Sequence, residues 1–305
     1  MKKIAVVTYM RSTEVFTTEM AEICQLLNEH LDDFKCILFS DKPISGLDQY
    51  EFKIENPIMN GTKYKKIKYI IDVDDSDYFI SIDNDITGNH KAIKNFVDQI
   101  IDGNCDVGWG KISIRHYSNV IESLVAVDKL LSHDFLRPLL WKFGIGISVP
   151  GQFFIVKGST FKNKLLQADT FLDDLALGLY INKHHEELNC LMYHESLGFE
   201  APNTSFRGLW TQRHRWALGY KKIYDHIEEP SEKNLLQIHG FFYHGLWLLN
   251  YVIIFVLGLI NPMISISYVL AMSLILVRKQ LRLLIPAIVY QLFFPIFHIR
   301  WFTSL

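Results

Sequence analysis

The sequence of 305 residues has few cysteines and almost no net charge. Its four cysteines are far apart and form no CxxC pair; they are Cys24, Cys36, Cys105 and Cys190. Isolated thiols of this kind are typical of a reducing compartment and argue against a cysteine-rich zinc site or a disulfide framework. A net charge of −2 gives no sign of the basic surface that binds nucleic acid, so we expect no nucleic-acid partner.

The sequence also lacks the pattern of a secretion signal. The apolar run after the basic start Met1–Lys3 stops at Val7, and Arg11 and Glu14 follow too early for a signal peptide. We interpret this start as a first β-strand and expect the soluble part of the chain to remain in the cytosol.

Charged residues are concentrated in residues 1–235, whereas residues 236–305 are mainly apolar and aromatic. This asymmetry predicts a soluble domain over 1–235 and a membrane domain over 236–305. The second part contains three apolar segments, Phe241–Ile260, Pro262–Val277 and Leu283–Phe297. The first has the ~20 residues that a spanning helix needs, and the other two are shorter.

The basic sequence Arg278–Arg282 separates the second apolar segment from the third. Because positive charge is retained on the cytosolic side, we expect a cytosolic loop there and a hairpin of the first two segments that turns near Asn261 and Pro262. The third segment either spans the membrane or lies re-entrant or interfacial. A soluble domain with buried helices is the alternative.

Strand and helix patterns alternate through the first hundred residues. The expected strands are Ile4–Tyr9, Cys36–Ser40 and Tyr78–Ile82, with Gln152–Lys157 as a further candidate, and the expected helices are Thr13–Leu31, Lys63–Val73 and Lys91–Asp102. The alternation predicts an α/β fold with a mostly parallel sheet and helices on both faces. Ligands bind at the carboxyl ends of such strands, where Thr8, Asp41 and Asp83 occur.

Asp83 and Asp85 lie one residue apart after an apolar strand. Two carboxylates at this spacing can share a hard divalent cation, which takes oxygen ligands and bridges phosphate oxygens. The alternative is an ordinary turn, in which Asp is common.

Two further motifs combine candidate functional residues with a structural alternative. Asp173 and Asp174 open an expected helix, where Thr170 and Asp173 also fit a capping box, whereas Asp174 is suited to act as a general base. Gln212, Arg215 and Trp216 share one helix face, which suits a diphosphate beside a sugar ring. An amphipathic helix at the membrane surface is the alternative for this second motif.

In this order, and just ahead of apolar segments, the three motifs resemble the membrane-bound family 2 glycosyltransferases, which include the synthases of cellulose, chitin, hyaluronan and poly-N-acetylglucosamine. The resemblance extends from Ile4 to about Tyr220, and Gln212–Trp216 is its most specific element. The sequence departs from the family at Ser40–Pro43, which lacks the usual paired acids, and at Asp173, where Glu is usual.

The resemblance implies a GT-A fold, a Rossmann-like nucleotide-diphospho-sugar transferase domain, with C-terminal transmembrane helices. It also implies the following roles: Thr8, Asp41, Lys63 and Asp83 bind the nucleotide-sugar, Asp85 with Asp83 holds Mg²⁺ or Mn²⁺, Asp174 is the catalytic base with Asp173 as a supporting acid, and Gln212, Arg215 and Trp216 hold the diphosphate and the acceptor.

The implied activity is inverting, metal-dependent transfer of a sugar, expected from a UDP-sugar, to a growing polysaccharide or oligosaccharide at the cytosolic face of the cell membrane, with multi-pass anchoring in the lipid bilayer. Transfer to a lipid-linked acceptor, which would make a glycolipid, is one alternative, and a catalytically silent subunit of a membrane synthase is another. Export of a polymer would require a homo-oligomer that completes a channel, because the expected helices are too few.

Overall fold

The computed structural model describes residues 2–11, 13–167 and 169–302. The chain divides into two compact units: the sheet unit, Met1–Ser113 with Ser148–Ala201, and the helical unit, Ile114–Ile147 with Pro202–Leu305. Residues 114–147 and 202–235, which the sequence assigns to the soluble domain, thus belong to the same unit as the apolar C-terminal segments. Residues 1, 12 and 168 of the predicted soluble domain and 303–305 of the predicted membrane domain lie outside the described residues.

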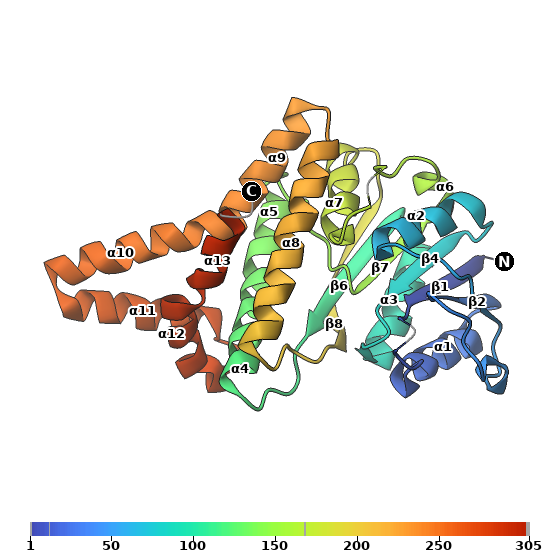
Figure 1. Ribbon diagram of the computed structural model, residues 1–305, viewed down its shortest axis with the longest axis horizontal. Coiled ribbons are helices and arrows are strands. Elements are labelled where there is room, and N and C mark those ends of the chain that lie inside the picture. The colour runs from blue at the N-terminus through green and yellow to red at the C-terminus, as the bar shows by residue number, and fades with distance from the viewer. Residues whose placement is uncertain (1, 12, 168, 303–305) are drawn as a thin grey trace. The chain divides into compact units, whose positions relative to one another are not determined.

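Within the described residues, the sheet unit contains one eight-stranded sheet with the strand order β3-β2-β1-β4-β7-β6-β8-β5 (Figure 1). Its strands are β1 (Lys3–Tyr9), β2 (Asp33–Phe39), β3 (Ile54–Glu55), β4 (Tyr78–Ile82), β5 (Thr87–Gly88), β6 (Val107–Ser113), β7 (Phe153–Lys157) and β8 (Cys190–Phe199). Its helices are α1 (Thr18–His30), η1 (Leu47–Gln49), α2 (Lys63–Val73), α3 (His90–Asp102), α6 (Gly158–Phe161) and α7 (Asp173–Lys183).

Strands β3, β2, β1 and β4 run parallel, as the alternation of strands and helices predicts. The prediction of a mostly parallel sheet is confirmed, since β6 and β8 are also parallel to each other, but two strands are reversed: β7 pairs antiparallel with both β4 and β6, and β5 pairs antiparallel with β8. The reversal places Phe153, the first residue of β7, opposite Ile82, the last residue of β4. The segments that follow β1, β2 and β4 and the segment that precedes β7 therefore meet at one edge of the sheet.

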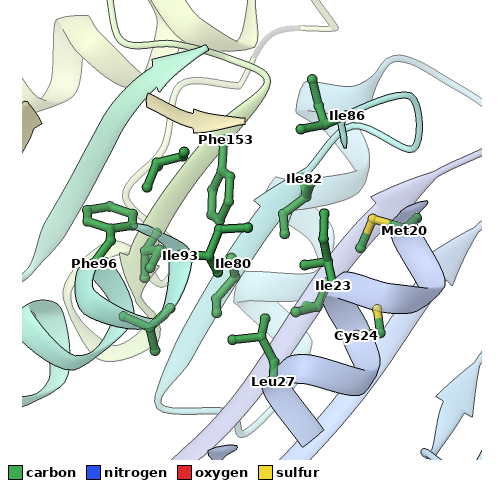
Figure 2. Packing of buried hydrophobic residues seen from close by; sticks show 14 of the residues in the cluster. Met20, Ile23, Cys24, Leu27, Ile80, Ile82, Ile86, Ile93, Phe96 and Phe153 are labelled. Carbon is green, nitrogen blue, oxygen red and sulfur yellow. The ribbon is translucent and has the colours of Figure 1, made fainter. Parts of the chain in front are cut away.

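Helices cover both faces of the sheet, as predicted. On one face, Ile23 of α1 and Phe96 of α3 belong to a buried cluster with Ile80 of β4 (Figure 2). On the other, Tyr69 of α2 packs edge-on against Phe39 of β2, with ring centroids 6.5 Å apart. Each fully buried large apolar side chain, such as Ile23 or Phe96, contributes about 1.5–3 kcal/mol, so the sheet that carries the polar residues at its edge is well packed.

The predicted boundaries are confirmed for α2 and β4, and α1 differs from its prediction. It begins at Thr18 instead of Thr13, because Thr17 accepts the N–H of Met20 and caps the first turn.

The helical unit contains α4 (Val120–Leu130), η2 (Leu131–Leu136), α5 (Arg137–Lys142), α8 (Phe206–His226), α9 (Pro230–Gly240), η3 (Phe241–Gly245), α10 (Leu246–Ile260), α11 (Pro262–Leu276), η4 (Leu281–Leu283), α12 (Leu284–Phe293) and α13 (Pro295–Phe302). Elements α9, η3 and α10 form one continuous helix, Pro230–Ile260, which in the described part of the chain is the one helix long and apolar enough to cross a membrane. Shorter apolar helices follow at Pro262–Leu276 and Leu281–Phe293.

The structure of the apolar segments confirms one prediction from the sequence and differs from another. The predicted turn is confirmed, since α10 and α11 form an antiparallel hairpin joined at Asn261 (Figure 1). The third segment is not one helix: α12 ends at Phe293 and α13 begins at Pro295, which has no N–H to continue the hydrogen-bond ladder.

Candidate active site

Lys63, the first residue of α2, lies between two carboxylates of the sheet unit. Its Nζ is 2.7 Å from Asp83 Oδ1 and 3.4 Å from Asp173 Oδ2, and it also donates to the carbonyl of Gly151. Asp83 follows β4, Gly151 precedes β7 and Asp173 begins α7, so one amine joins segments that are distant in the sequence. Burial alone would lower the pKa of Lys63, but Asp173 and Asp83 outweigh it and raise this pKa.

The sequence Gly61-Thr62-Lys63 fixes the start of α2. Thr62 caps the helix by accepting the N–H of Lys65, and its hydroxyl donates to Asp169 at 2.6 Å. Gly61 has φ +120°, a conformation that other residues rarely adopt, and a Cβ there would lie 2.8 Å from the Lys65 Cδ. The turn therefore requires glycine, and it delivers Lys63 to the sheet edge.

Asp173 is partly buried beside Lys63, with 14% of its side chain exposed, and is not part of a capping box. Burial raises the pKa of Asp173, Lys63 opposes this shift, and Asp83 adds to it. Helix α7 begins at Asp173 itself, its N-cap residue Leu172 makes no side-chain cap, and Thr170 instead accepts the N–H of Leu172 at 3.1 Å. The capping interpretation of Thr170 and Asp173 is therefore wrong, and the ion pair with Lys63 accounts for Asp173.

Asp174, the predicted base, is the next residue of α7 and is partly buried. Its Oδ1 accepts the N–H of Leu175 at 2.9 Å. A carboxylate held in the first turn of a helix has a fixed orientation, which a general base requires. Its role remains a prediction.

Asp85 carries the excess negative charge of the site. It lies in a turn after β4 in which the N–H of Ile86 donates to the carbonyl of Asp83 at 3.3 Å. Asp85 is exposed on one side, but the protein atoms around its carboxyl group partly desolvate it and raise its pKa to about 6, and the charges of Asp83 and Glu200 add to the shift. Glu200 is itself held by the side-chain amide of Gln152 at 3.0 Å. Because Lys63 compensates Asp83, Asp85 is the carboxylate better placed to accept a cation.

The oxygen ligands at Asp85 fit a hard divalent cation whose remaining ligands come from outside the protein. In the described part of the chain, no group of three or more His, Cys, Asp or Glu side chains is arranged to hold a metal. Mg²⁺ is commonly bound in this way, by one or two carboxylates together with substrate phosphates and water. The metal predicted at Asp85 and Asp83 is therefore consistent with a site that is completed by a diphosphate.

Thr8 and Asp41 lie at the carboxyl ends of β1 and β2, which are neighbours in the sheet. The Thr8 Oγ1 and Asp41 Oδ1 atoms are buried and make no hydrogen bond within the described residues. A buried polar atom without a partner costs about 1–3 kcal/mol, so two of them at the ligand-binding edge indicate a polar ligand.

Lys66 is a candidate residue that the sequence reasoning missed. It is 8% exposed; burial lowers its pKa, and the charges of Asp41 and Glu14 act against this shift. The signal available in the sequence was its spacing, because Lys66 follows Lys63 by three residues and so shares its face of α2. Gly151 also belongs to the site, because a Cβ there would come within 3.2 Å of Asp173 Oδ2.

The predicted Gln-x-x-Arg-Trp residues lie on α8 of the helical unit. Gln212 accepts from Asn203 at 3.0 Å, and Arg215 is exposed. The ring of Trp216 lies 4.2 Å from the guanidinium of Arg213, which pairs with Asp128 at 2.5 Å. Within this unit, Arg215 is therefore the residue of the motif best able to bind an anion, whereas Gln212 has an internal partner.

Comparison with known proteins gives no family, since no family model and none of the curated proteins matches the chain. Among solved structures, TarS residues 1–349 of S. aureus is similar with a TM-score of 0.47 and 12% identity over 78% of this chain and 72% of that one. Glucosyl-3-phosphoglycerate synthase of Mycobacterium tuberculosis is similar in complexes with Mn²⁺, UDP and phosphoglyceric acid (TM-score 0.49, 13% identity, 72% of this chain and 78% of that one) and with Mg²⁺ and UDP (0.49, 12%, 72% and 79%). Similarity at this level does not assign an activity, which has to be argued from the residues of the chain itself.

Proposed function

We propose that the chain is a membrane-bound, GT-A-type, family 2-like glycosyltransferase that moves a sugar with inversion from a nucleotide-sugar, expected to be a UDP-sugar, to a saccharide or lipid-linked acceptor. One observation carries the proposal. At a single edge of the sheet, the Asp85 carboxylate is available to a cation, Lys63 is held between Asp83 and Asp173, and Thr8 and Asp41 have buried oxygens without partners.

This edge combines the groups that a nucleoside diphosphate needs. Thr8 and Asp41 offer a hydroxyl and a carboxylate to the base and ribose. Asp85 would hold Mg²⁺ or Mn²⁺, which when bound neutralises the charge that develops on the leaving diphosphate. Lys63 holds Asp83 and Asp173 in fixed positions beside it.

In the proposed reaction, an acceptor hydroxyl oxygen attacks the anomeric carbon and forms the new glycosidic bond as the bond to the diphosphate breaks. Asp174 takes the hydroxyl proton, and the nucleoside diphosphate leaves with the electron pair. A general base of this kind contributes roughly 10²–10⁴ in rate. We assign the base to Asp174 because Asp173 is already committed to its ion pair with Lys63.

The membrane part of the proposal is supported by the apolar helix Pro230–Ile260. An apolar stretch of 18 residues in this helix is only 11% buried, unlike a core helix of a soluble protein. The basic residues Arg278, Lys279 and Arg282 follow α11, as expected for a cytosolic loop. We propose that the catalytic unit faces the cytosol at the cell membrane.

The test is release of nucleoside diphosphate by the detergent-solubilised protein from a panel of UDP- and GDP-sugars, with saccharide and lipid acceptors supplied. We expect release from one donor with Mn²⁺ or Mg²⁺, and its loss both with EDTA and in Asp174→Asn. Product size then separates a polymer from a lipid that carries one or few sugars. Absence of release from every donor would reject the enzyme in favour of a silent subunit, whereas release that survives in Asp174→Asn would reject only the assignment of the base.

A further inference from the structure

We propose that α10 and α11 form a hairpin that enters the bilayer from one face and ends inside the hydrocarbon core, so that the tip at Asn261 does not reach the opposite surface. The inference rests on the membrane part of the proposed function. It identifies the partner of this apolar surface as lipid acyl chains, and it makes the hairpin monotopic.

The length of the return arm limits the depth that the hairpin can reach. Helix α11 has 15 residues, which corresponds to a length of ~22 Å. Arg278 comes directly after Val277, where this arm ends, and a cation remains at the headgroup level. Because the hydrocarbon core is ~30 Å thick, the tip stops short of the far side.

Several polar groups of the tip bond within the tip itself. The N–H of Asn261 donates to the Leu257 carbonyl at 2.8 Å, and its side chain accepts the N–H of Met263 at 2.8 Å. The N–H of Ile264 donates to the Asn261 carbonyl at 3.0 Å, and Pro262 has no N–H to satisfy. An unpaired backbone polar group is costly in hydrocarbon, and these bonds lower that cost at the turn.

Apart from Asn261, the outer surface of the tip is apolar. Leu259, Ile260 and Met263 are 73%, 69% and 66% exposed. No Asp, Glu, Lys or Arg occurs between Lys233 and Arg278, and no Trp or Tyr occurs in residues 252–267. A spanning hairpin would carry interfacial aromatic residues at both membrane surfaces, so the tip lacks the signature of a second surface.

The two arms are bonded to each other, so the hairpin needs no protein partner to hold it together. The Ser265 hydroxyl donates to the Ile254 carbonyl at 2.9 Å, and the Tyr268 hydroxyl donates to Asn250 at 2.8 Å. At the base of the hairpin, the guanidinium of Arg278 stacks on Phe135 at 4.9 Å. Cations at this end and none at the tip match a surface of anionic headgroups on one side only.

Cysteine accessibility tests the inference. Cys190→Ser removes the one exposed cysteine, since Cys24, Cys36 and Cys105 are buried. On this background, Met263→Cys places a thiol at the tip and Gln280→Cys places a matched control at the base. In sealed vesicles of both orientations, we expect a membrane-impermeant maleimide to label Gln280→Cys from the catalytic side and Met263→Cys from neither side until detergent is added.

Burial in protein could also prevent labelling, so a nitroxide at Met263→Cys gives a second measurement. We expect relaxation by oxygen, which dissolves in hydrocarbon, and protection from a water-soluble nickel complex. Labelling from the opposite face, or relaxation by nickel, would overturn the inference and leave a spanning hairpin. Recovery of the protein in the soluble fraction, with the tip labelled without detergent, would instead reject the membrane location. Sugar transfer by the same samples tests the catalytic proposal separately.

Discussion

Replacing Lys63 by methionine should be among the most damaging single substitutions in the sheet unit. The lysine side chain is 18% exposed, and its amine lies 2.7 Å from Asp83 and 3.4 Å from Asp173. Lys63→Met keeps the apolar stem but leaves two neighbouring carboxylates without a cation. Removing one partner of a buried ion pair typically costs about 3–5 kcal/mol, because the remaining charge is buried and uncompensated.

That loss corresponds to a fall in melting temperature of roughly 6–20 °C, at about 2–4 °C per kcal/mol for a domain of this size. Thermal unfolding in detergent without metal measures it. The control is Lys3→Met, because the Lys3–Asp75 pair has side chains 51% and 76% exposed and such pairs contribute about 1 kcal/mol or less. Adding Asp173→Asn to Lys63→Met should recover part of the loss. If Lys63→Met lowers the melting temperature no more than Lys3→Met, the amine does not hold the two carboxylates.

Three further predictions concern charge and backbone. The pKa of Asp85 is raised to about 6, so its contribution to stability is present at acid pH and is lost as pH rises through 6. Asp85→Asn should therefore stabilise the metal-free protein at pH 8 but not at pH 4, which unfolding at the two pH values would show. The expected gain is about 1 kcal/mol or less, because the residue is exposed to solvent. Asp128→Asn should destabilise the helical unit by about 3–5 kcal/mol, because it leaves the largely buried Arg213 without its ion-pair partner. In the same thermal unfolding assay, the control Asp225→Asn should have little effect, because it removes only the exposed Lys221–Asp225 pair. Gly61→Ala should cost at least about 1 kcal/mol and lower donor affinity, because φ +120° is strained for alanine; an unchanged melting temperature would show that the turn relaxes freely.

The sequence predicts those elements whose apolar pattern is local. Helix α2 and strand β4 have the predicted ends, because a capping threonine and a continuous apolar run mark them. The antiparallel insertion of β7 between β4 and β6 depends on pairing between distant segments, which no local pattern encodes. The break at Pro295 did have a local signal, since proline ends a helix, but the apolar run around it hid that signal.

The sequence predicted which residues form the candidate site, but not the contacts among them. Lys63, Asp83 and Asp173 were all named from the sequence, yet the ion pairs among them arise only when α2, β4 and α7 meet at the sheet edge. That contact makes the two acids after β4 different, because Lys63 compensates the negative charge of Asp83 but not that of Asp85. The spacing of two residues in the sequence cannot show which of the two carboxylates forms an ion pair with Lys63.

Metal-dependent binding of UDP tests most directly whether this edge is a nucleotide-diphosphate site. Calorimetric titration of the protein with UDP, with and without Mn²⁺, should show binding that requires the metal. Asp85→Asn should lose most of this metal-dependent affinity, whereas Asp102→Asn, an exposed carboxylate at the end of α3, should bind as the natural protein does. UDP binding that is unaffected by Mn²⁺ and by Asp85→Asn would contradict the proposed site.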